Sequence, residues 1–108
     1  MTTVTLQQIF QGIYLLRLPL PFRLNHVNSF LIEGEKGYTI IDAGLHTEKT
    51  AQIWDEVLKG RPVEKIIITH YHPDHYGFAG QLQQKTGSPV YMSATDARVV
   101  RQFWTAVY

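Results

Sequence analysis

The sequence predicts a mixed α/β domain in which strands come first and helices then alternate with strands. Two observations support this fold class. Residues 4–42 are rich in β-branched and aromatic side chains divided by glycine and proline turns, as in strands. From Thr47 onward, the apolar residues recur about every 3.6 positions, the period of a helix. At 108 residues the chain is long enough for one core, so residues 1–108 are assigned to a single domain.

Strands are expected over most of the amino-terminal part. They cover residues 4–6, 9–10, 13–18, 27–32 and 38–42. Pro19 and Pro21 end the third strand because proline lacks the N–H group that a sheet requires. Residues 34–37 begin and end with glycine, which suits a tight turn. The last two strands are therefore predicted to form a hairpin.

The following segment predicts a strand, a helix and another strand. Thr47 can cap a helix that runs to Leu58 and ends before Gly60. Residues 64–69 form a short apolar run that suits a buried strand. A second helix over 78–85 ends at Gly87, and a short strand covers 89–92. Residues 93–96 resemble a capping box that begins a last helix.

The last predicted helix has a broad apolar stripe that continues to the final residue. The stripe consists of Val99, Val100, Phe103, Trp104, Val107 and Tyr108. No stop signal or following element is present to cover it, so the chain resembles a truncated domain. We expect the carboxy-terminal half of the domain or a second copy of the chain to cover this helix, and an oligomer or a poorly soluble monomer otherwise.

Composition excludes several classes of protein. The hydrophobic share of 44% and the charged share of 18% exclude disorder driven by charge. Ten Lys and Arg residues against nine Asp and Glu residues, with no basic run, argue against a nucleic-acid partner. The absence of cysteine excludes disulfides, thiol nucleophiles and thiolate zinc sites. No segment is apolar for the length of a membrane span, so the default expectation is a cytoplasmic protein without a membrane partner.

Four ligand-type side chains, His70, His72, Asp74 and His75, follow the predicted strand over 64–69. An extended backbone directs His70 and His72 to the same side, and Pro73 lets the next two residues turn back toward them. Imidazole and carboxylate without thiolate suit zinc, iron or manganese. A histidine cluster without a metal is the less favoured interpretation, because this spacing arises by chance in about one such chain in a thousand.

The segment His70-Tyr71-His72-Pro73-Asp74-His75 resembles the H-x-H-x-D-H signature of the metallo-β-lactamase-fold superfamily of metallohydrolases. The strand that ends in Ile40-Ile41-Asp42-Ala43-Gly44 is also similar to a strand of this family. The resemblance implies an αββα sandwich with a mixed sheet and helices on its outer face, of which this chain supplies the amino-terminal half. It further implies that His70 and His72 hold one metal ion and that Asp74 and His75 hold a second. Further ligands would come from the half that follows.

The expected function is that of a metal-dependent hydrolase with zinc as its cofactor, two ions in the complete domain. A hydroxide formed from water whose pKa the metal lowers would attack a carbonyl or phosphoryl centre. Asp74 would bind metal and orient this nucleophile. Among the activities that the resemblance implies, hydrolysis of a small thioester, lactone or other ester is expected, because the charge pattern does not suggest an RNA substrate. The alternatives are a non-hydrolytic metal-binding or iron redox protein of the same fold, or a fragment that is inactive by itself.

Several other residues are assigned supporting roles. Asp42 is expected to hydrogen-bond to the backbone of the metal site or to a ligand imidazole. His26 and His46 are interpreted as surface or loop residues rather than ligands, and a substrate contact by His26 is the less favoured alternative. Ser29 and Ser93 have no visible general base, so a serine-hydrolase triad is unsupported. Trp54 and Trp104 lie on helical apolar stripes and are expected in the core.

Overall fold

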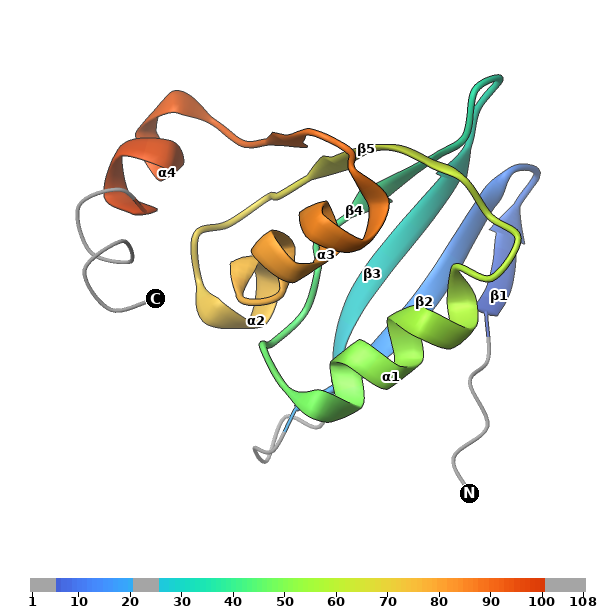
Figure 1. Ribbon diagram of the computed structural model, residues 1–108, viewed down its shortest axis with the longest axis horizontal. Coiled ribbons are helices and arrows are strands. Elements are labelled where there is room, and N and C mark those ends of the chain that lie inside the picture. The colour runs from blue at the N-terminus through green and yellow to red at the C-terminus, as the bar shows by residue number, and fades with distance from the viewer. Residues whose placement is uncertain (1–5, 21–25, 101–108) are drawn as a thin grey trace.

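The computed structural model describes residues 6–20 and 26–100, which form one mixed six-stranded sheet with helices (Figure 1). The strands lie side by side in chain order, from β1 at one edge to β6 at the other. The strands are β1 (Leu6–Phe10), β2 (Ile13–Pro19), β3 (His26–Glu33), β4 (Tyr38–Ile41), β5 (Val63–Ile67) and β6 (Val90–Tyr91). The helices are α1 (Glu48–Val57), α2 (Pro73–Tyr76), α3 (Ala79–Thr86) and α4 (Ala94–Val99). The α/β class predicted from the sequence is confirmed.

The first four strands form an antiparallel meander. β2 pairs with both β1 and β3, and β3 pairs with β4, with Leu31 opposite Ile40. Gly34 donates its N–H to the carbonyl of Gly37 over 3.0 Å, which closes the turn between β3 and β4. The predicted hairpin is therefore confirmed. Residues 4 and 5, the start of the first predicted strand, lie outside the described residues.

The second part of the sheet is parallel. Helix α1 connects β4 to β5, and these two strands pair in parallel with Ile40 opposite Ile66. β5 in turn runs parallel to β6. The side chain of Thr47 accepts the N–H of Thr50 over 3.1 Å, so Thr47 caps α1 as expected. Parallel pairing places the carboxyl ends of β4 and β5 at one edge of the sheet, and this arrangement positions the candidate site.

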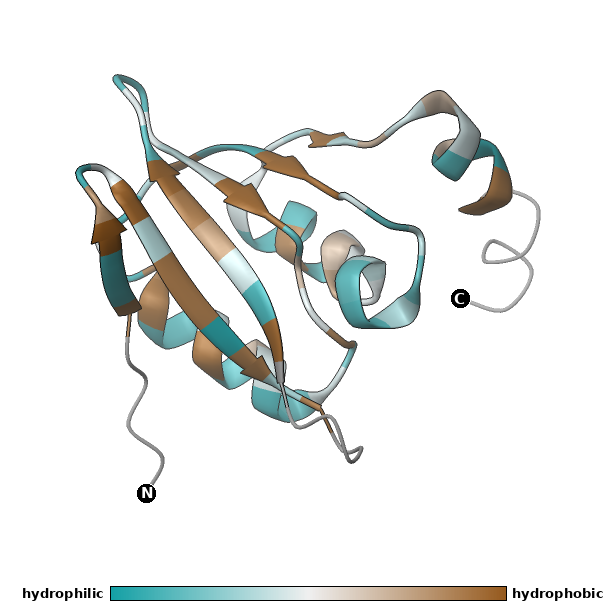
Figure 2. Cartoon of the chain, turned by 180° about the vertical axis from the view of Figure 1, so that it is seen from behind, coloured by the Kyte–Doolittle hydropathy of each residue, from teal (hydrophilic) through white to brown (hydrophobic). Residues whose placement is uncertain are grey.

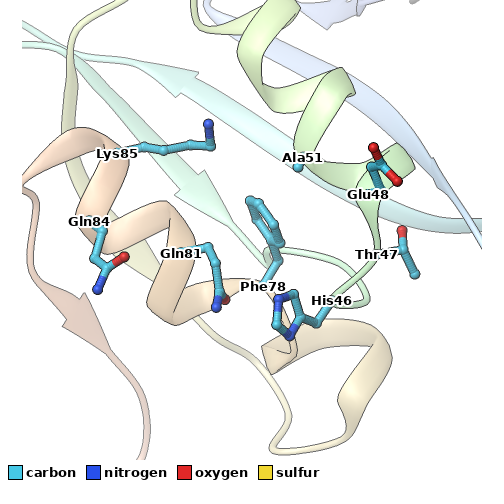
Figure 3. Close-up of a pocket in the computed structure, with 8 residues that line it drawn as sticks. All are labelled: His46, Thr47, Glu48, Ala51, Phe78, Gln81, Gln84 and Lys85. Atoms are coloured by element: carbon cyan, nitrogen blue, oxygen red, sulfur yellow. The ribbon is translucent and has the colours of Figure 1, made fainter.

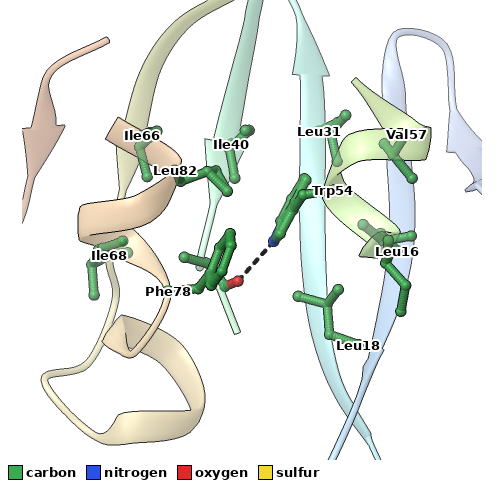
Figure 4. Packing of buried hydrophobic residues seen from close by; sticks show 13 residues of the cluster. Leu16, Leu18, Leu31, Ile40, Trp54, Val57, Ile66, Ile68, Phe78 and Leu82 are labelled. Carbon is green, nitrogen blue, oxygen red and sulfur yellow. Dashed lines mark hydrogen bonds between the residues drawn. The ribbon is translucent and has the colours of Figure 1, made fainter. Parts of the chain in front are cut away.

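The hydrophobic core lies between the sheet and the helices α1 and α3, which cover the same face (Figures 1 and 4). Leu31, Ile40 and Ile66 from neighbouring strands are fully buried there. Trp54 of α1 is also fully buried, as predicted, and its indole N–H donates to the carbonyl of Ala43 over 2.8 Å. This hydrogen bond ties the core to the loop that follows β4.

The opposite face of the sheet carries no helix in the described part of the chain (Figure 2). Side chains alternate along a strand, so the residues on either side of Leu31 point to this face. One of them, Ile32, is 38% exposed, and Tyr91 of β6 is 53% exposed. A sheet that is apolar on both faces suits the inner layer of a sandwich.

The structure corrects the boundaries of the segment that carries the histidines. β5 ends at Ile67, two residues earlier than the predicted strand, so Ile68 and Thr69 belong to a loop. Residues Pro73–Tyr76 form a one-turn helix, α2, rather than a simple turn. Proline favours this result because its fixed φ and missing N–H suit the first position of a helix.

The carboxy-terminal apolar stripe lies mostly outside the described residues. Val100 is only 9% exposed, whereas Phe103, Trp104, Val107 and Tyr108 are not described. The covering of this stripe by the carboxy-terminal half of the domain or by a second copy of the chain stays a prediction. Within the described ranges, no helix combines the length and the apolar character needed to cross a membrane.

Candidate metal centre

The candidate site lies at the edge of the sheet where the parallel strands β4 and β5 end. Asp42 follows β4 directly, and Thr69 comes two residues after β5. The backbone N–H of Asp42 donates to the carbonyl of Ile67 over 2.8 Å, which extends the pairing beyond the strands. The histidine-rich loop and α2 follow from this point. Parallel topology thus brings together two segments that are far apart in the sequence.

Asp42 has an unusual backbone conformation. With a φ of 67°, it is the sole non-glycine residue in the left-handed region within the described part of the chain. The buried hydroxyl of Ser29 lies 3.0 Å from the carbonyl oxygen of Ile41 and 2.8 Å from that of Asp42. These contacts of Ser29, together with the hydrogen bond from the N–H of Asp42 to Ile67, stabilise the turn at Asp42. Ser29 therefore has a structural role at this turn.

The carboxylate of Asp42 connects the two segments. Its side chain is only 8% exposed. Oδ1 accepts the backbone N–H of Thr69 over 2.7 Å, and Oδ2 accepts the hydroxyl of Thr69 over 2.7 Å. Oδ2 also lies 2.8 Å from Nδ1 of His75. The prediction that Asp42 hydrogen-bonds to the site's backbone and to an imidazole is confirmed.

Thr69 also belongs to the site, although no role was assigned to it from the sequence. Its hydroxyl bonds to Asp42 and also lies 2.9 Å from Nδ1 of His70. The available signal was a hydroxyl residue at the strand end, immediately before the first histidine. A threonine in an apolar β-branched run was instead assigned to the strand itself.

Backbone contacts hold α2 against the loop that follows β4. Ala43 donates its N–H to the carbonyl of His75 over 2.9 Å, and Phe78 donates to that of Gly44 over 2.9 Å. Gly77 lies in the contact between these segments. A Cβ atom on Gly77 would be 2.9 Å from the backbone nitrogen of His46, so a side chain would force the two segments apart. Close packing therefore fixes His75 relative to Asp42.

The motif side chains lie in one patch. The rings of His70 and His72 have centroids 6.1 Å apart, and those of His70 and His75 are 4.8 Å apart. Oδ2 of Asp74 lies 3.7 Å from Nε2 of His75. Among residues 6–20 and 26–100, no three histidine, cysteine, aspartate or glutamate side chains are arranged to hold one ion. The division implied by the resemblance needs only two ligands per ion from this chain, and ligation by these four residues stays a prediction.

The donor chemistry of the patch fits a divalent transition metal. Histidine ligands in metal sites commonly use one ring nitrogen for the metal and the other for a carboxylate, a backbone carbonyl or water. In His70 and His75, Nδ1 already contacts Thr69 and Asp42, respectively, which leaves Nε2 for a metal. With no cysteine in the chain, imidazole and carboxylate are the remaining strong ligands.

The other histidines stand apart from the motif. His46 is exposed, as expected, and its ring centroid is 6.0 Å from that of Phe78. Both line a cavity of about 600 Å³ between the start of α1 and α3, together with Gln81 and Lys85 (Figure 3). None of the four motif residues lines this cavity. The side chain of His26 lies outside the described residues.

Comparison with known proteins agrees with the motif. Residues 23–108 match the family model of the Metallo-beta-lactamase superfamily. A probable metallo-hydrolase, YqjP of Bacillus subtilis, is 33% identical over 72 residues, which cover 62% of this chain and 22% of YqjP. A hydroxyacylglutathione hydrolase of Albidiferax ferrireducens is 33% identical over 82 residues, covering 73% of this chain and 29% of the relative. Exodeoxyribonuclease WalJ of Streptococcus pneumoniae is 37% identical over 65 residues, covering 59% and 24%.

A solved structure shows the same fold. The metallo-beta-lactamase FIM-1 of Pseudomonas aeruginosa, in its mono-zinc form, superposes with a TM-score of 0.71 at 26% identity. The match covers 94% of this chain and 46% of FIM-1. The chain thus spans about half of a metallo-beta-lactamase and less than a third of the three curated relatives. Its mixed sheet with helices matches about half of the FIM-1 chain, and the chain belongs to the metallo-beta-lactamase superfamily.

Proposed function

We propose that the protein is a zinc-dependent hydrolase whose metal site uses His70, His72, Asp74 and His75. One observation carries this proposal: the buried carboxylate of Asp42 organises the histidine loop by three hydrogen bonds, two to Thr69 and one to His75. A buried carboxylate that bonds to the Nδ1 atom of an imidazole is a common arrangement around catalytic metals.

The residues of this site have separate proposed roles in metal binding, water orientation and positioning. Bound zinc would lower the pKa of water and polarise the substrate. His70 and His72 would bind one ion, and Asp74 and His75 a second. The side chain of Asp74 is 31% exposed, so it can both face an ion and orient a water molecule beside it. Asp42 is buried behind the loop and holds His75 in place.

The proposed substrate is a small thioester, lactone or other carboxylic ester. The formal charge of +1 and the absence of a basic run give no attraction for a polyanion. A relative of this chain is named as a hydroxyacylglutathione hydrolase, which agrees with an ester-type substrate. The second candidate is a phosphodiester, because another relative is named as an exodeoxyribonuclease. The chain covers less than a third of each relative, and assays with both substrate classes distinguish the ester from the phosphodiester.

The test is metal-dependent hydrolysis by the complete protein. The protein is stripped with a chelator, reloaded with zinc and assayed with a thioester, a lactone and single-stranded DNA. We expect zinc to restore hydrolysis of the thioester or the lactone. The double variant His70→Ala/His72→Ala should remain inactive, whereas His46→Ala should behave as wild type because His46 lies outside the motif.

Three results would contradict the proposal. Activity that survives chelation would exclude a metal-dependent reaction. Cleavage of DNA without hydrolysis of the thioester or the lactone would show that the substrate is a phosphodiester and not an ester. Iron in the purified protein, with a visible absorption spectrum and no hydrolysis, would indicate the iron redox alternative. We further expect the 108-residue chain alone to hydrolyse little, because two ligands per ion are fewer than the usual three of a catalytic zinc.

A further inference from the structure

We propose that Thr69 is a positioning residue. Its hydroxyl connects the carboxylate of Asp42 to the ring of His70 by hydrogen bonds, so that this carboxylate fixes the tautomers of both His70 and His75. The inference rests on the proposed metal site and adds to it a role for a side chain outside the H-x-H-x-D-H pattern. It follows from the hydrogen bonds around Oδ2 of Asp42.

The direction of these hydrogen bonds follows from counting protons. An ionised carboxylate only accepts hydrogen bonds. The hydroxyl of Thr69 has one proton, and its contact with Oδ2 of Asp42 at 2.7 Å uses that proton. Toward Nδ1 of His70, at 2.9 Å, the hydroxyl oxygen can then only accept. Nδ1 of His70 must carry hydrogen, and a neutral ring therefore has its lone pair on Nε2.

His75 is held in the same tautomer, with hydrogen on Nδ1, by its direct contact with Asp42. Its Nδ1 atom lies 2.8 Å from Oδ2 of Asp42, so Nδ1 donates and Nε2 keeps the lone pair. The rings of His70 and His75 are neighbours, with centroids 4.8 Å apart. Asp42 thus sets His75 directly and His70 through Thr69. An imidazole free in water favours the opposite tautomer, with hydrogen on Nε2, so both rings are held in the form that is otherwise less populated.

The geometry explains why a threonine suits this position. Thr69 precedes His70 in the chain, and its backbone N–H is bonded to Oδ1 of Asp42 over 2.7 Å. The branched side chain has few rotamers, and the backbone contact fixes its origin, so the hydroxyl stays between the carboxylate and the ring. His70 itself is exposed. A hydrogen bond, rather than close packing, must then hold its ring.

The test reads the tautomers directly in the metal-free protein. Long-range proton–nitrogen correlation spectra, recorded at alkaline pH where imidazole is neutral, identify which ring nitrogen carries hydrogen. We expect Nδ1–H for both His70 and His75 in the wild type. In Thr69→Val, His70 should shift to Nε2–H while His75 keeps Nδ1–H, which also shows that the fold is intact. Thr69→Ser retains the hydroxyl and should restore the wild-type pattern.

Zinc affinity provides the second measurement. Loss of such a supporting hydrogen bond typically weakens metal binding about 10–100-fold, so Thr69→Val should lose that much and Thr69→Ser much less. A wild-type His70 with hydrogen on Nε2, or a Thr69→Val variant with unchanged tautomers and zinc affinity, would overturn the inference. If the wild type shows the expected tautomers but binds no zinc, the proposed metal site fails instead.

Discussion

Gly77→Ala should destabilise the protein by distorting α2 and displacing it from the loop after β4. A Cβ atom on Gly77 would lie 2.5 Å from the carbonyl oxygen of Pro73, 2.9 Å from the nitrogen of His46 and 3.3 Å from the carbonyl oxygen of Gly44. All three atoms belong to the backbone, so no side-chain rotation can relieve the contact. Overpacking of this kind costs about 1–3 kcal/mol.

Gly80→Ala is the matched control. Gly77 has a φ of −51°, a conformation that alanine adopts readily, so the effect of its substitution comes from packing rather than from the backbone. Gly80 lies in α3, and apart from the backbone of its own helix and its chain neighbours no atom lies within 4 Å of its Cβ position. There, alanine should stabilise by about 0.4–1 kcal/mol, because it restricts the unfolded chain. The two variants make the same chemical change with opposite expected signs.

Thermal and urea unfolding measure the difference. For a chain of this size each kcal/mol shifts Tm by about 4–8 °C, so Gly77→Ala should melt clearly below wild type and Gly80→Ala slightly above it. The α2 contact also positions His75, so zinc affinity should fall only in Gly77→Ala. Equal stability of the two variants, with an unchanged urea dependence, would refute the argument that these segments are in tight contact.

Three further outcomes are expected. Zinc at about one hundred times its Kd should add about 2.7 kcal/mol to the unfolding free energy, and a melt of His70→Ala/His72→Ala that still rises with zinc would contradict the assigned ligands. Trp54→Phe should cost about 1–3 kcal/mol, because the carbonyl of Ala43 loses its buried donor; an unchanged urea midpoint would argue against that hydrogen bond. Thr47→Ala should cost about 1 kcal/mol through the lost cap of α1, whereas removing the exposed Lys59 to Glu56 ion pair should cost less than half as much in the same assay.

Much of the fold could be predicted because local signals coincide with tertiary structure. Thr47 caps α1, Gly87 ends α3 with a φ of 72°, and Ser93 accepts the N–H of Asp96 at the start of α4. Each of these signals acts over three or four residues, which a single sequence shows directly. The boundary of β5 is different, because it depends on the partner strand and on the backbone N–H of Thr69, which donates to the carboxylate of Asp42.

The candidate site was predictable in its residues and only partly in its contacts. The spacing of His70, His72, Asp74 and His75 identifies the motif. Asp42 is distant from the motif in sequence, and only the strand that ends in aspartate and glycine indicated its role. For Thr69 the sequence offered only a hydroxyl residue at the end of a predicted strand, since its contacts with a carboxylate and an imidazole form only in the folded turn. The left-handed conformation of Asp42 was equally hidden, because it depends on Ser29 in another strand.

The most direct test of the metal centre is a crystal structure of the zinc-loaded complete protein, with diffraction data collected on both sides of the zinc absorption edge. Anomalous difference maps locate zinc without assumptions about its ligands. We expect peaks about 2.0–2.2 Å from the ring nitrogens of His70 and His72 and from the donor atoms of Asp74 and His75. We also expect Nε2 to be the bound atom of His70 and His75, with Thr69 and Asp42 still on Nδ1. Zinc bound elsewhere, with these four side chains free of metal, would contradict the proposed metal centre.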